Sequence, residues 1–412
     1  MRFHHNAVPV VLLVLLLDSI GFGIVLPVLP GLVVHLGHVG LPQATRIAGY
    51  MLATYAIMQF FAGPIIGNLG DRFGRRLVLL SCVVAFAIDY GLMAAAPSIS
   101  WLFLGRAIAG IAGASYSPAT AVLADITPPA ERGKAFGFMG GAFGIGFILG
   151  PAIGGLLSGF GTRAPFIAAA ALAAVNAVWI LASLPETLSA ENRRPFEWRR
   201  ANPIGTFKPL LAISTAAPLL IASFLWQLAH NVYPATWAFW SALALHWNAK
   251  QIGWSLAAAG LAMAATQVFL AGRAVSRFGE ERCIVAGMLA GGISFAAYAV
   301  IDTGWMVYPV IVFSALQGLV FPSINALLSR MTDAQNQGAL QGGMASIASI
   351  ASIVGPLVMT QMLAFGAERG WPGSAFALAA GFVAIGLLFV WFGVLRRLRP
   401  VAEDNSAPGG AL

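Results

Sequence analysis

The chain has few charged residues and almost no cysteine. Charged side chains make up 9% of its 412 residues, and hydrophobic residues make up 59%. Soluble proteins carry about 25% charged residues, so this composition excludes a soluble globular fold. The two cysteines, Cys82 and Cys283, cannot build a disulfide framework or a metal cluster. We predict that both are packing residues.

Sequence signals for chemistry are missing as well. The chain has no nucleotide-binding loop, no metal-ligand spacing and no candidate catalytic nucleophile. We therefore expect neither an enzyme nor an ATP-driven pump, and we expect no cofactor and no metal site. Large polar stretches that could form a soluble sensor domain are absent too, which disfavours a membrane receptor that does not transport.

Apolar segments of about 20 residues, long enough to cross a bilayer, recur along the chain. They predict an all-α membrane protein with twelve transmembrane helices, near 7–34, 44–66, 77–96, 100–123, 135–158, 164–184, 212–243, 249–271, 283–301, 305–328, 338–364 and 373–395. The first segment contains Asp18 and has no small-x-small cleavage site, so we interpret it as a retained helix and not a signal peptide.

A ten-residue motif occurs twice. Residues 67–76 read GNLGDRFGRR, and residues 272–281, 205 positions later, read GRAVSRFGEE. Gly150 and Gly355 keep the same offset, as do Thr127 and Thr332. We therefore predict two six-helix repeats, 1–185 and 212–412, joined by an arginine- and proline-rich cytoplasmic linker at 186–211. Duplicated membrane halves are typical of secondary transporters.

Basic residues are distributed very unevenly between the two sides of the predicted bundle. Of the 23 lysines and arginines, 18 lie on the side shared by the termini and the linker, and four lie on the other side. Segments rich in lysine and arginine stay in the cytoplasm, so both termini, the linker and the repeated motif are predicted to be cytoplasmic. The net charge of +8 is thus explained by topology in the cell (inner) membrane, and no nucleic-acid partner is expected.

Three charged residues are predicted to lie within the membrane: Asp18, Asp89 and Arg106. A charge there costs several kcal/mol unless it is paired, hydrated or neutralised. One arginine cannot easily compensate two separated carboxylates, so at least one acid is expected to exchange protons. We favour Asp89 as the acid that exchanges protons. Glycines and prolines near Asp18 loosen its helix and could admit water or substrate, which would help to solvate the charge of Asp18. A static ion pair that holds the helices together is the alternative.

The second half keeps the layout but loses these charges. At the offset of 205, serines replace both acids and Ile311 replaces Arg106. We infer that the first half handles protons and that the second half mostly shapes the cavity. Candidate cavity residues from both halves are Gln59, Trp226, His230, Gln317, Asn325 and Gln341. For His230, a satisfied polar residue within the bundle is the alternative.

The fifth predicted helix carries glycines at spacings of three and four. Such glycines let another backbone approach closely, and the proline among them permits a bend. The five candidate positions are Gly146, Gly150, Pro151, Gly154 and Gly155. In the cytoplasmic motif, glycines predict a tight turn, and charges of both signs could bind neighbouring helix ends and hold that side closed. These gate candidates are Gly67, Asp71, Arg72, Gly74, Arg75, Arg76 and Asp125.

Residues 67–76 resemble the signature loop of the major facilitator superfamily. The segment 146–155 resembles the fifth-helix motif of its drug/proton antiporter branch, and the stretches at 18–30, 89–90, 104–106 and 337–342 are similar to bacterial tetracycline exporters. The resemblance covers nearly the whole chain. It implies the major facilitator fold and proton-coupled drug efflux by alternating access, and it places functional weight on the intramembrane and gate charges named above.

Two positions depart from those exporters. The resemblance leads one to expect an acid in the ninth helix and a histidine in the eighth, where this chain has Gly291 and Met263. We therefore expect tetracycline to be a poorer substrate than some other amphipathic compound. A nutrient importer or facilitator of the same superfamily is the alternative function. The expected partners are a small amphipathic substrate, protons and lipid, with the protein acting as a monomer.

Overall fold

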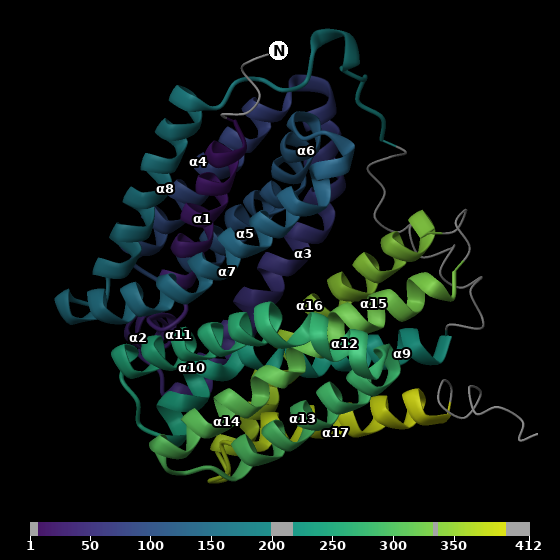
Figure 1. Ribbon diagram of the computed structural model, residues 1–412. Helices are drawn as coiled ribbons and strands as arrows, with labels where there is room; N and C mark the ends of the chain where they lie inside the picture. The colour runs from purple at the N-terminus through teal and green to yellow at the C-terminus, as the bar shows by residue number, and fades with distance from the viewer. Residues whose placement is uncertain (1–6, 199–216, 333–336, 393–412) are drawn as a thin grey trace, which may run out of the picture.

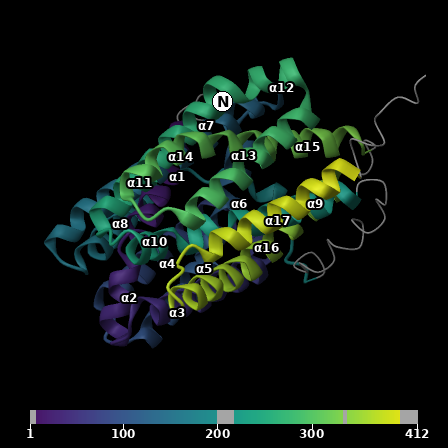
Figure 2. The same ribbon diagram turned by 90° about the horizontal axis from the view of Figure 1, so that it is seen from below.

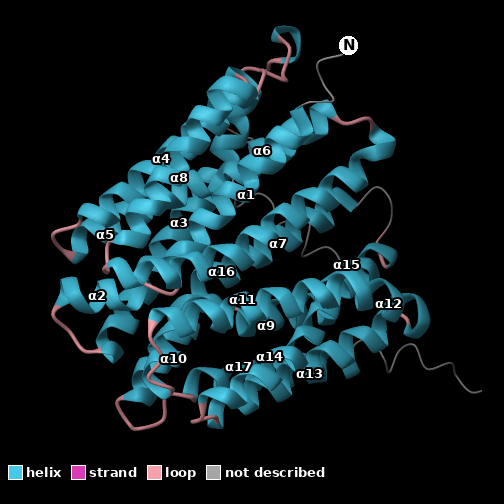
Figure 3. Cartoon of the chain, turned by 60° about the vertical axis from the view of Figure 1, so that its left-hand side comes forward, coloured by secondary structure: helices cyan, strands magenta, loops and turns pink. Residues whose placement is uncertain are grey.

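Helices are the only regular secondary structure in the part of the chain that the structure, a computed structural model, describes (Figure 3). The described residues are 7–198, 217–332 and 337–392. Parts of several predicted features therefore lie outside them: the linker from 199 onward, the start of the seventh segment, the C-terminal tail, and the basic residues Arg2, Arg199, Arg200, Lys208, Arg396, Arg397 and Arg399.

The first group of helices runs to residue 183. It comprises α1 (Ala7–Val25), α2 (Leu29–Gly37), α3 (Leu41–Phe73), α4 (Arg75–Ala95), α5 (Ile99–Ala112), α6 (Tyr116–Ile126), α7 (Arg132–Leu157) and α8 (Ala164–Ser183). Short 3₁₀ turns join or extend some of these helices, at η1 (Gly113–Ser115), η2 (Pro129–Glu131) and η3 (Ser158–Phe160). Another, η4 (Ala190–Asn192), lies in the linker.

The second group begins at residue 217. It comprises α9 (Ala217–His230), α10 (Val232–Ala244), α11 (Ala249–Ala265), the π-helical turn η8 (Thr266–Ala271), α12 (Gly272–Phe278), α13 (Glu280–Val300), η9 (Gly304–Met306), α14 (Val307–Ser314), the 3₁₀ turn η10 (Ala315–Leu319), α15 (Val320–Arg330), α16 (Gln337–Ala367) and α17 (Ser374–Val390). In Figure 2, α13 and α16 run beside α17, which packs against both.

Ten stretches of the described helices are long and apolar enough to cross a membrane. The interrupted pair α9 and α10 and the shorter α17 correspond to the two remaining predicted segments, so the architecture is consistent with twelve spans. The predicted helix at 7–34 is not continuous, since α1 ends at Val25 and α2 begins at Leu29. Pro27 and Pro30 have no backbone N–H and cannot continue the helical hydrogen bonds, which explains the break.

The two groups of helices meet along two seams, α3 with α16 and α7 with α11. An ion pair of 2.8 Å between Arg46 Nη2 and Glu368 Oε2 joins the start of α3 to the residues after α16. A Cβ at Gly49, a turn further along α3, would collide with Thr360 of α16. From this end the groups diverge toward the end that carries α6, α12 and α15 (Figure 1).

Aromatic side chains fill the core of the second group. Trp237, Trp240, Tyr298 and Phe376 are buried against one another, with ring centroids 5.0 to 6.2 Å apart. The indole N–H of Trp237 donates to Ser255 Oγ at 2.9 Å, so its polar atom is satisfied. Aromatic clusters of this kind add to the stabilisation from buried area alone, and this one holds α10, α11, α13 and α17 together.

Candidate functional site

Asp89 on α4 and Arg106 on α5 form a buried ion pair. The Nη2 of Arg106 donates to Asp89 Oδ2 and also lies 3.0 Å from Met93 Sδ. The carboxylate is fully buried, and a Cβ at Gly105 would lie 2.6 Å from its other oxygen, so the glycine leaves room for it. Arg106 therefore compensates the charge of Asp89, and in this structure it forms no ion pair with Asp18.

Among the described residues, Asp18 on α1 has only an amide for a partner. The Nδ2 of Asn176 on α8 donates to Asp18 Oδ1 at 2.9 Å and to the backbone carbonyl of Val14 at 3.1 Å. The second oxygen of Asp18 is buried and has no hydrogen-bond partner among the described residues. A negative charge at this position would therefore be balanced by no cation of the described chain, and it would cost several kcal/mol.

Glycines of α7 let this helix approach the helix that carries Asp18. A Cβ on Gly146 would lie 2.8 Å from the carbonyl of Leu16, and one on Gly150 would lie 2.7 Å from the Cα of Gly23. One on Gly154 would collide with the carbonyl of Ile24. Any larger residue at these positions would push the two helices apart, so α1 and α7 are held as one unit.

The same helix also forms a seam between the two groups. Gly155 faces away from α1, and a Cβ there would lie 2.8 Å from the carbonyl of Ala249 at the start of α11. Across the seam, a Cβ on Gly253 would collide with the carbonyl of Pro151. Small residues pack α7 against α1 on one side and against α11 on the other. A movement of α1, which carries Asp18, can therefore be transmitted to the second group through α7 alone.

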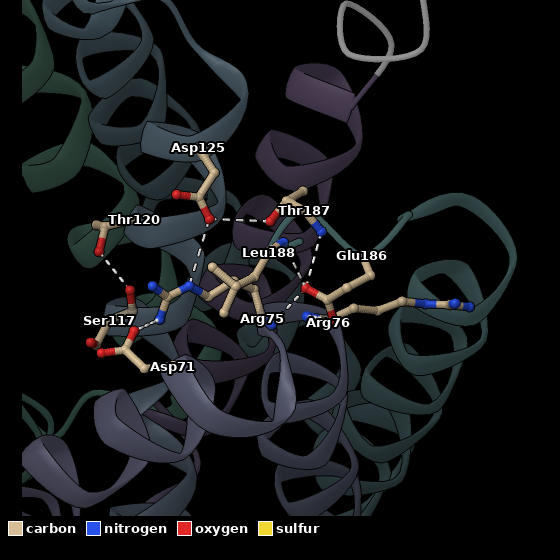
Figure 4. A network of polar contacts seen from close by, with 9 residues as sticks. All are labelled: Asp71, Arg75, Arg76, Ser117, Thr120, Asp125, Glu186, Thr187 and Leu188. Carbon is tan, nitrogen blue, oxygen red and sulfur yellow. Dashed lines mark hydrogen bonds and ion pairs between the residues drawn. The ribbon is translucent and has the colours of Figure 1, made fainter. Parts of the chain in front are cut away.

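The signature loop between α3 and α4 forms a network of charges (Figure 4). Arg75 Nη1 lies 2.5 Å from Asp71 Oδ1, and Arg75 Nε lies 3.6 Å from Asp125 Oδ2 at the end of α6. Thr187 Oγ1 donates to the same oxygen of Asp125 at 3.4 Å. These contacts tie the loop to α6 and to the beginning of the linker, all on the side of the first group.

The carboxylate of Glu186, at the start of the linker, binds the N-terminus of α4. Its Oε1 accepts from the backbone N–H groups of Arg75, Thr187 and Leu188 at 2.9 to 3.0 Å. Unpaired N–H groups at a helix N-terminus favour a negative charge, so this is a stabilising cap. Gly74 is needed beside it, because its φ is +105° and a Cβ would collide with the Glu186 carboxylate.

The other predicted gate residues lie around this network. Arg76 Nη2 donates to the carbonyl of Leu181 on α8 at 2.5 Å, and a Cβ on Gly67 would lie 3.3 Å from Ser117 Oγ. Arg72 is exposed, and its guanidinium lies over the Phe73 ring, 5.0 Å from the ring centroid. The structure thus brings Asp71, Arg75 and Asp125 together, turns the Arg76 side chain away toward α8, and leaves Arg72 at the surface (Figure 4).

Two pockets contain most of the predicted cavity residues. The first, of about 290 Å³, lies within the second group and includes Trp226, His230 and Gln317 in its lining. The second, of about 340 Å³, lies between α3 and α16 and includes Gln59. Asn325 and Gln341 line neither of them: Asn325 Nδ2 donates to a carbonyl of its own helix at 2.9 Å, and Gln341 is exposed.

Two residues that contact the predicted site residues escaped the sequence analysis. Asn176, the partner of Asp18, is the single amide in the otherwise apolar segment 164–184, and this isolation is a signal that could have found it. Glu186 follows the last residues of the sixth predicted helix, where an acid near a basic loop could have indicated a cap. Neither signal says which partner is bound, because that depends on how neighbouring helices are rotated.

Known proteins are similar to this chain over nearly its whole length. The sequence model of the Major Facilitator Superfamily matches residues 11–242 and 219–411. The chain is 39% identical to the tetracycline resistance protein, class C, of Escherichia coli, over 92% of this chain and 95% of that protein. It is 30% identical to multidrug resistance protein 2 of Bacillus subtilis (strain 168), over 90% and 92% of the two chains.

Solved structures have the same fold. A human organic anion transporter superposes with a TM-score of 0.68 at 24% identity, covering 95% of this chain and all of that one. A nucleoside transporter superposes with a TM-score of 0.77 at 16% identity, covering 94% and 99% of the two chains. The expectations of an all-α membrane fold and of a facilitator-type family are confirmed. The chain belongs to the major facilitator superfamily.

Proposed function

We propose that this protein is a proton-coupled secondary transporter that exports small amphipathic compounds by alternating access. The observation that carries the proposal is the environment of Asp18, a carboxyl group buried among membrane helices, with an amide on one oxygen and no hydrogen bond from any described residue to the other. Such a group can accept a proton without leaving a cation unpaired. It also lies on the helix that packs tightly against α7, so its charge state can influence the contact between the two groups of helices.

Asp18 is a better candidate for the exchangeable site than Asp89. The sequence favoured Asp89, but Arg106 is bonded to that residue. Protonation of Asp89 would leave a buried arginine without its partner, which is strongly unfavourable. Protonation of Asp18 removes an uncompensated charge instead. We assign the proton to Asp18 and a supporting role to the pair of Asp89 and Arg106, which fixes α4 against α5.

The direction of transport rests on the orientation in the membrane. We propose that the termini and the linker are cytoplasmic and that the protein is a multi-pass protein of the inner membrane, as the distribution of lysine and arginine indicates. The end at which the two groups diverge then faces the cytoplasm (Figure 1). A substrate would enter from this side, and closure there would accompany opening of the seam that holds Arg46 and Glu368.

The relatives support an exporter over an importer. Two of them, from Escherichia coli and Bacillus subtilis, are named for resistance to tetracycline and to multiple drugs, and the chain covers more than nine tenths of each. For this chain we propose a small-molecule substrate and protons as the transported partners, a monomer in the lipid bilayer, and no enzymatic activity. Binding energy from the substrate and the proton is then the only source of the conformational change.

The signature loop is proposed to act through the conformational equilibrium. Asp71, Arg75 and Asp125 lie at the cytoplasmic end in the proposed orientation and line neither pocket. They can change turnover by favouring one state of the transporter over another, and they have no direct contact through which to change substrate affinity. In the present state their contacts remain within the first group and the linker.

Reconstitution in liposomes tests the proposal. Purified protein would be given an imposed pH gradient, and uptake of tetracycline and unrelated amphipathic drugs would be measured beside proton release. We expect at least one compound to move against its gradient in exchange for protons. Transport that runs equally well without a pH gradient, or that moves a solute in the same direction as the protons, would contradict antiport.

The variant Asp18→Asn sharpens the test. The amide imitates the protonated acid in shape, so gradient-driven transport should fall by at least about a hundredfold, while the fold and the binding of substrate persist. Asn176→Ala is the matched variant on the other side of the hydrogen bond, and it should shift the pH dependence of transport without abolishing it. Full pH-dependent transport by Asp18→Asn would remove the assignment of the proton to this residue.

A further inference from the structure

The fourth membrane span of each half is interrupted by a 3₁₀ turn. The span Ile99–Ile126 contains η1 between α5 and α6, and the span Gly304–Arg330 contains η10 between α14 and α15. A 3₁₀ stretch in the middle of a helix often marks a hinge, because its hydrogen bonds have poorer geometry than those of an α-helix. The two spans begin 205 residues apart, so the interruption belongs to both copies of the repeat.

A glutamine from a neighbouring span binds each interruption. The Nε2 of Gln59, on α3, donates to the carbonyl of Gly113, the first residue of η1, at 3.0 Å. The Nε2 of Gln267, in η8, donates to the carbonyl of Gly318, within η10, at 2.9 Å. A side chain that inserts into the ladder of backbone hydrogen bonds of a helix can fix a bend there. Each interruption is thus tied to the second span of its own half by one amide.

Two glycines leave the space that these amides occupy. A Cβ on Gly113 would lie 2.9 Å from Gln59 Nε2, and a Cβ on Gly318 would lie 3.1 Å from Gln267 Nε2. Both distances are tighter than ordinary van der Waals contact, so a larger residue would push the amide away from the carbonyl. Both partners therefore shape the contact, the glutamine that donates and the glycine that accepts.

The glycines keep the repeat offset of 205 residues, but the glutamines do not. Ala264 stands at the position equivalent to Gln59, and Ala62 stands at the position equivalent to Gln267. A side chain retained only by duplication would keep the same offset as the glycines. The two halves instead form the same hydrogen bond from different positions, which points to the bond itself as the common requirement.

The half-helices beyond the interruptions, α6 and α15, carry charges at their far ends. Asp125 of α6 pairs with Arg75 at 3.6 Å, and Arg330, the last residue of α15, pairs with Glu280 at 2.9 Å. Each half-helix is therefore fixed by an amide at one end and by an ion pair at the other. The two groups diverge at the end that carries α6 and α15 (Figure 1). The direction of these half-helices thus influences how far apart the groups stand there.

From this geometry we propose that Gln59 and Gln267 are positioning residues of the transport cycle. Each amide holds the hinge of its half at the angle seen here, and loss of the bond lets α6 or α15 take a second direction. The role in transport rests on the proposed exporter function, whereas the hinge itself does not. Both glutamines also contribute to the lining of a pocket, so direct contact with substrate is the competing explanation.

The test is the distance between spin labels at the two ends of each fourth span, measured in the full-length protein without substrate or ion gradient. Labels at the exposed Ser100 and Ala130 flank the first hinge, and labels at the exposed Thr303 and Met331 flank the second. Both native cysteines would be replaced by alanine, so that only the introduced cysteines react.

Methionine in place of glutamine keeps the length of the side chain and removes the donor. Gln59→Met should raise the population of a second distance across the first hinge about fivefold and leave the second hinge unchanged. Gln267→Met should have the converse effect. The matched control is Thr120→Val on α6, because the Thr120 hydroxyl donates at 2.7 Å to the Ser117 carbonyl within the same helix. This control should leave both distances unchanged.

Circular dichroism and thermal melting would verify that each variant is folded. The two hinges are tested independently, so if one variant fails to fold, the other decides the proposal. Unaltered distances in a folded glutamine variant would overturn the hinge in that half.

Transport measurements separate the hinge from a substrate contact. For a compound exported in the liposome screen, Gln59→Met should lower the maximal rate about fivefold with the half-saturating concentration unchanged. A raised half-saturating concentration with unchanged distances would assign the glutamine to substrate contact and overturn the hinge. The exporter function would stand in that case. Altered distances in the variants of a protein that exports no compound would keep the hinge and overturn the exporter function.

Discussion

The two halves of the molecule carry the same ion pair with opposite polarity. In the first half Arg75 at the start of α4 faces Asp125 at the end of α6, and in the second half Glu280 at the start of α13 faces Arg330 at the end of α15. Both positions are related by the offset of 205 residues. The repeat has kept the contact between two helix ends and has exchanged the charges, so geometry at this point is more constrained than the sign of either residue.

The halves differ more deeply inside the membrane. The first half holds Asp18, Asp89 and Arg106. In the second half uncharged serines replace both acids: Ser294 donates to a carbonyl of its own helix, and Ser223 is buried. The second half instead has the π-helical turn η8, whereas α3 runs as a regular helix through the corresponding residues 61–66. The intramembrane charges and the π-helical turn thus lie in different copies of one scaffold.

Breaking the buried ion pair should have the largest effect on stability. Asp89→Asn leaves Arg106 buried without its anion, which costs about 3 to 5 kcal/mol, so the melting temperature should fall sharply. The double variant Asp89→Asn with Arg106→Gln should recover most of this loss. The sequence analysis favoured Asp89 as the acid that exchanges protons and kept a static ion pair as the alternative, and the structure shows Arg106 bonded to Asp89.

The equivalent position of the second half provides the control. Ser294, on α13, donates to the carbonyl of Ala290 at 2.7 Å and bears no charge, so Ser294→Ala should change stability by less than about 1 kcal/mol. Thermal unfolding in the same detergent would compare the two variants. Equal losses at both positions would mean that Asp89 contributes only packing.

The exchanged ion pairs should differ in their effect on turnover. Arg75 is mostly buried and forms ion pairs with two acids, so Arg75→Ala and Asp71→Asn should lower the maximal transport rate about tenfold with little change in substrate affinity. Arg330 is 68% exposed, so Arg330→Ala should change the rate less than about twofold. Transport and binding would be measured on the same preparations. Loss of affinity with an unchanged conformational equilibrium would contradict the gate assignment.

The substrate pocket of the second half should discriminate against tetracycline. Met263 lines a pocket without charged side chains, and Gly291 has no room for an acid beside Trp226. Cells that express the protein should gain less than about fourfold resistance to tetracycline, and more to another amphipathic compound. Growth inhibition across a drug panel would measure this. Strong resistance selective for tetracycline would show the expectation to be wrong.

The ion pair between Arg46 and Glu368, across the seam of α3 and α16, should have the smallest effect. The side chains of Arg46 and Glu368 are 37% and 46% exposed, and surface pairs contribute about 0.2 to 1 kcal/mol. Arg46→Ala should therefore shift the ratio of the two transport states about twofold toward opening at this end. Distances between spin labels on α6 and α15 would report the shift. Adding about 0.5 M salt should weaken the ion pair in the parent protein and so reduce the difference between the parent and the variant.

The sequence was sufficient to predict the fold and to single out the charged residues within the membrane, because apolar length, the repeat and the rarity of intramembrane charge are strong signals. It could not predict which side chains bond each other. That Arg106 bonds Asp89, and that Asn176 bonds Asp18, depends on the rotation of each helix about its axis. The break at Pro27 was visible as two prolines, whereas the π-helical turn at 266–271 carries no proline or other marker in the sequence.

The linker docks onto the signature loop, and this contact determines where the chain can be cut into two fragments. Besides the cap by Glu186, the backbone N–H of Arg194 donates to the carbonyl of Asp71 at 3.0 Å, and Asn68 Nδ2 donates to the carbonyl of Glu197 at 2.7 Å. Residues up to 198 therefore belong physically to the first half, although composition alone assigns them to the connection. Two co-expressed fragments cut after 198 should assemble better than fragments cut after 185.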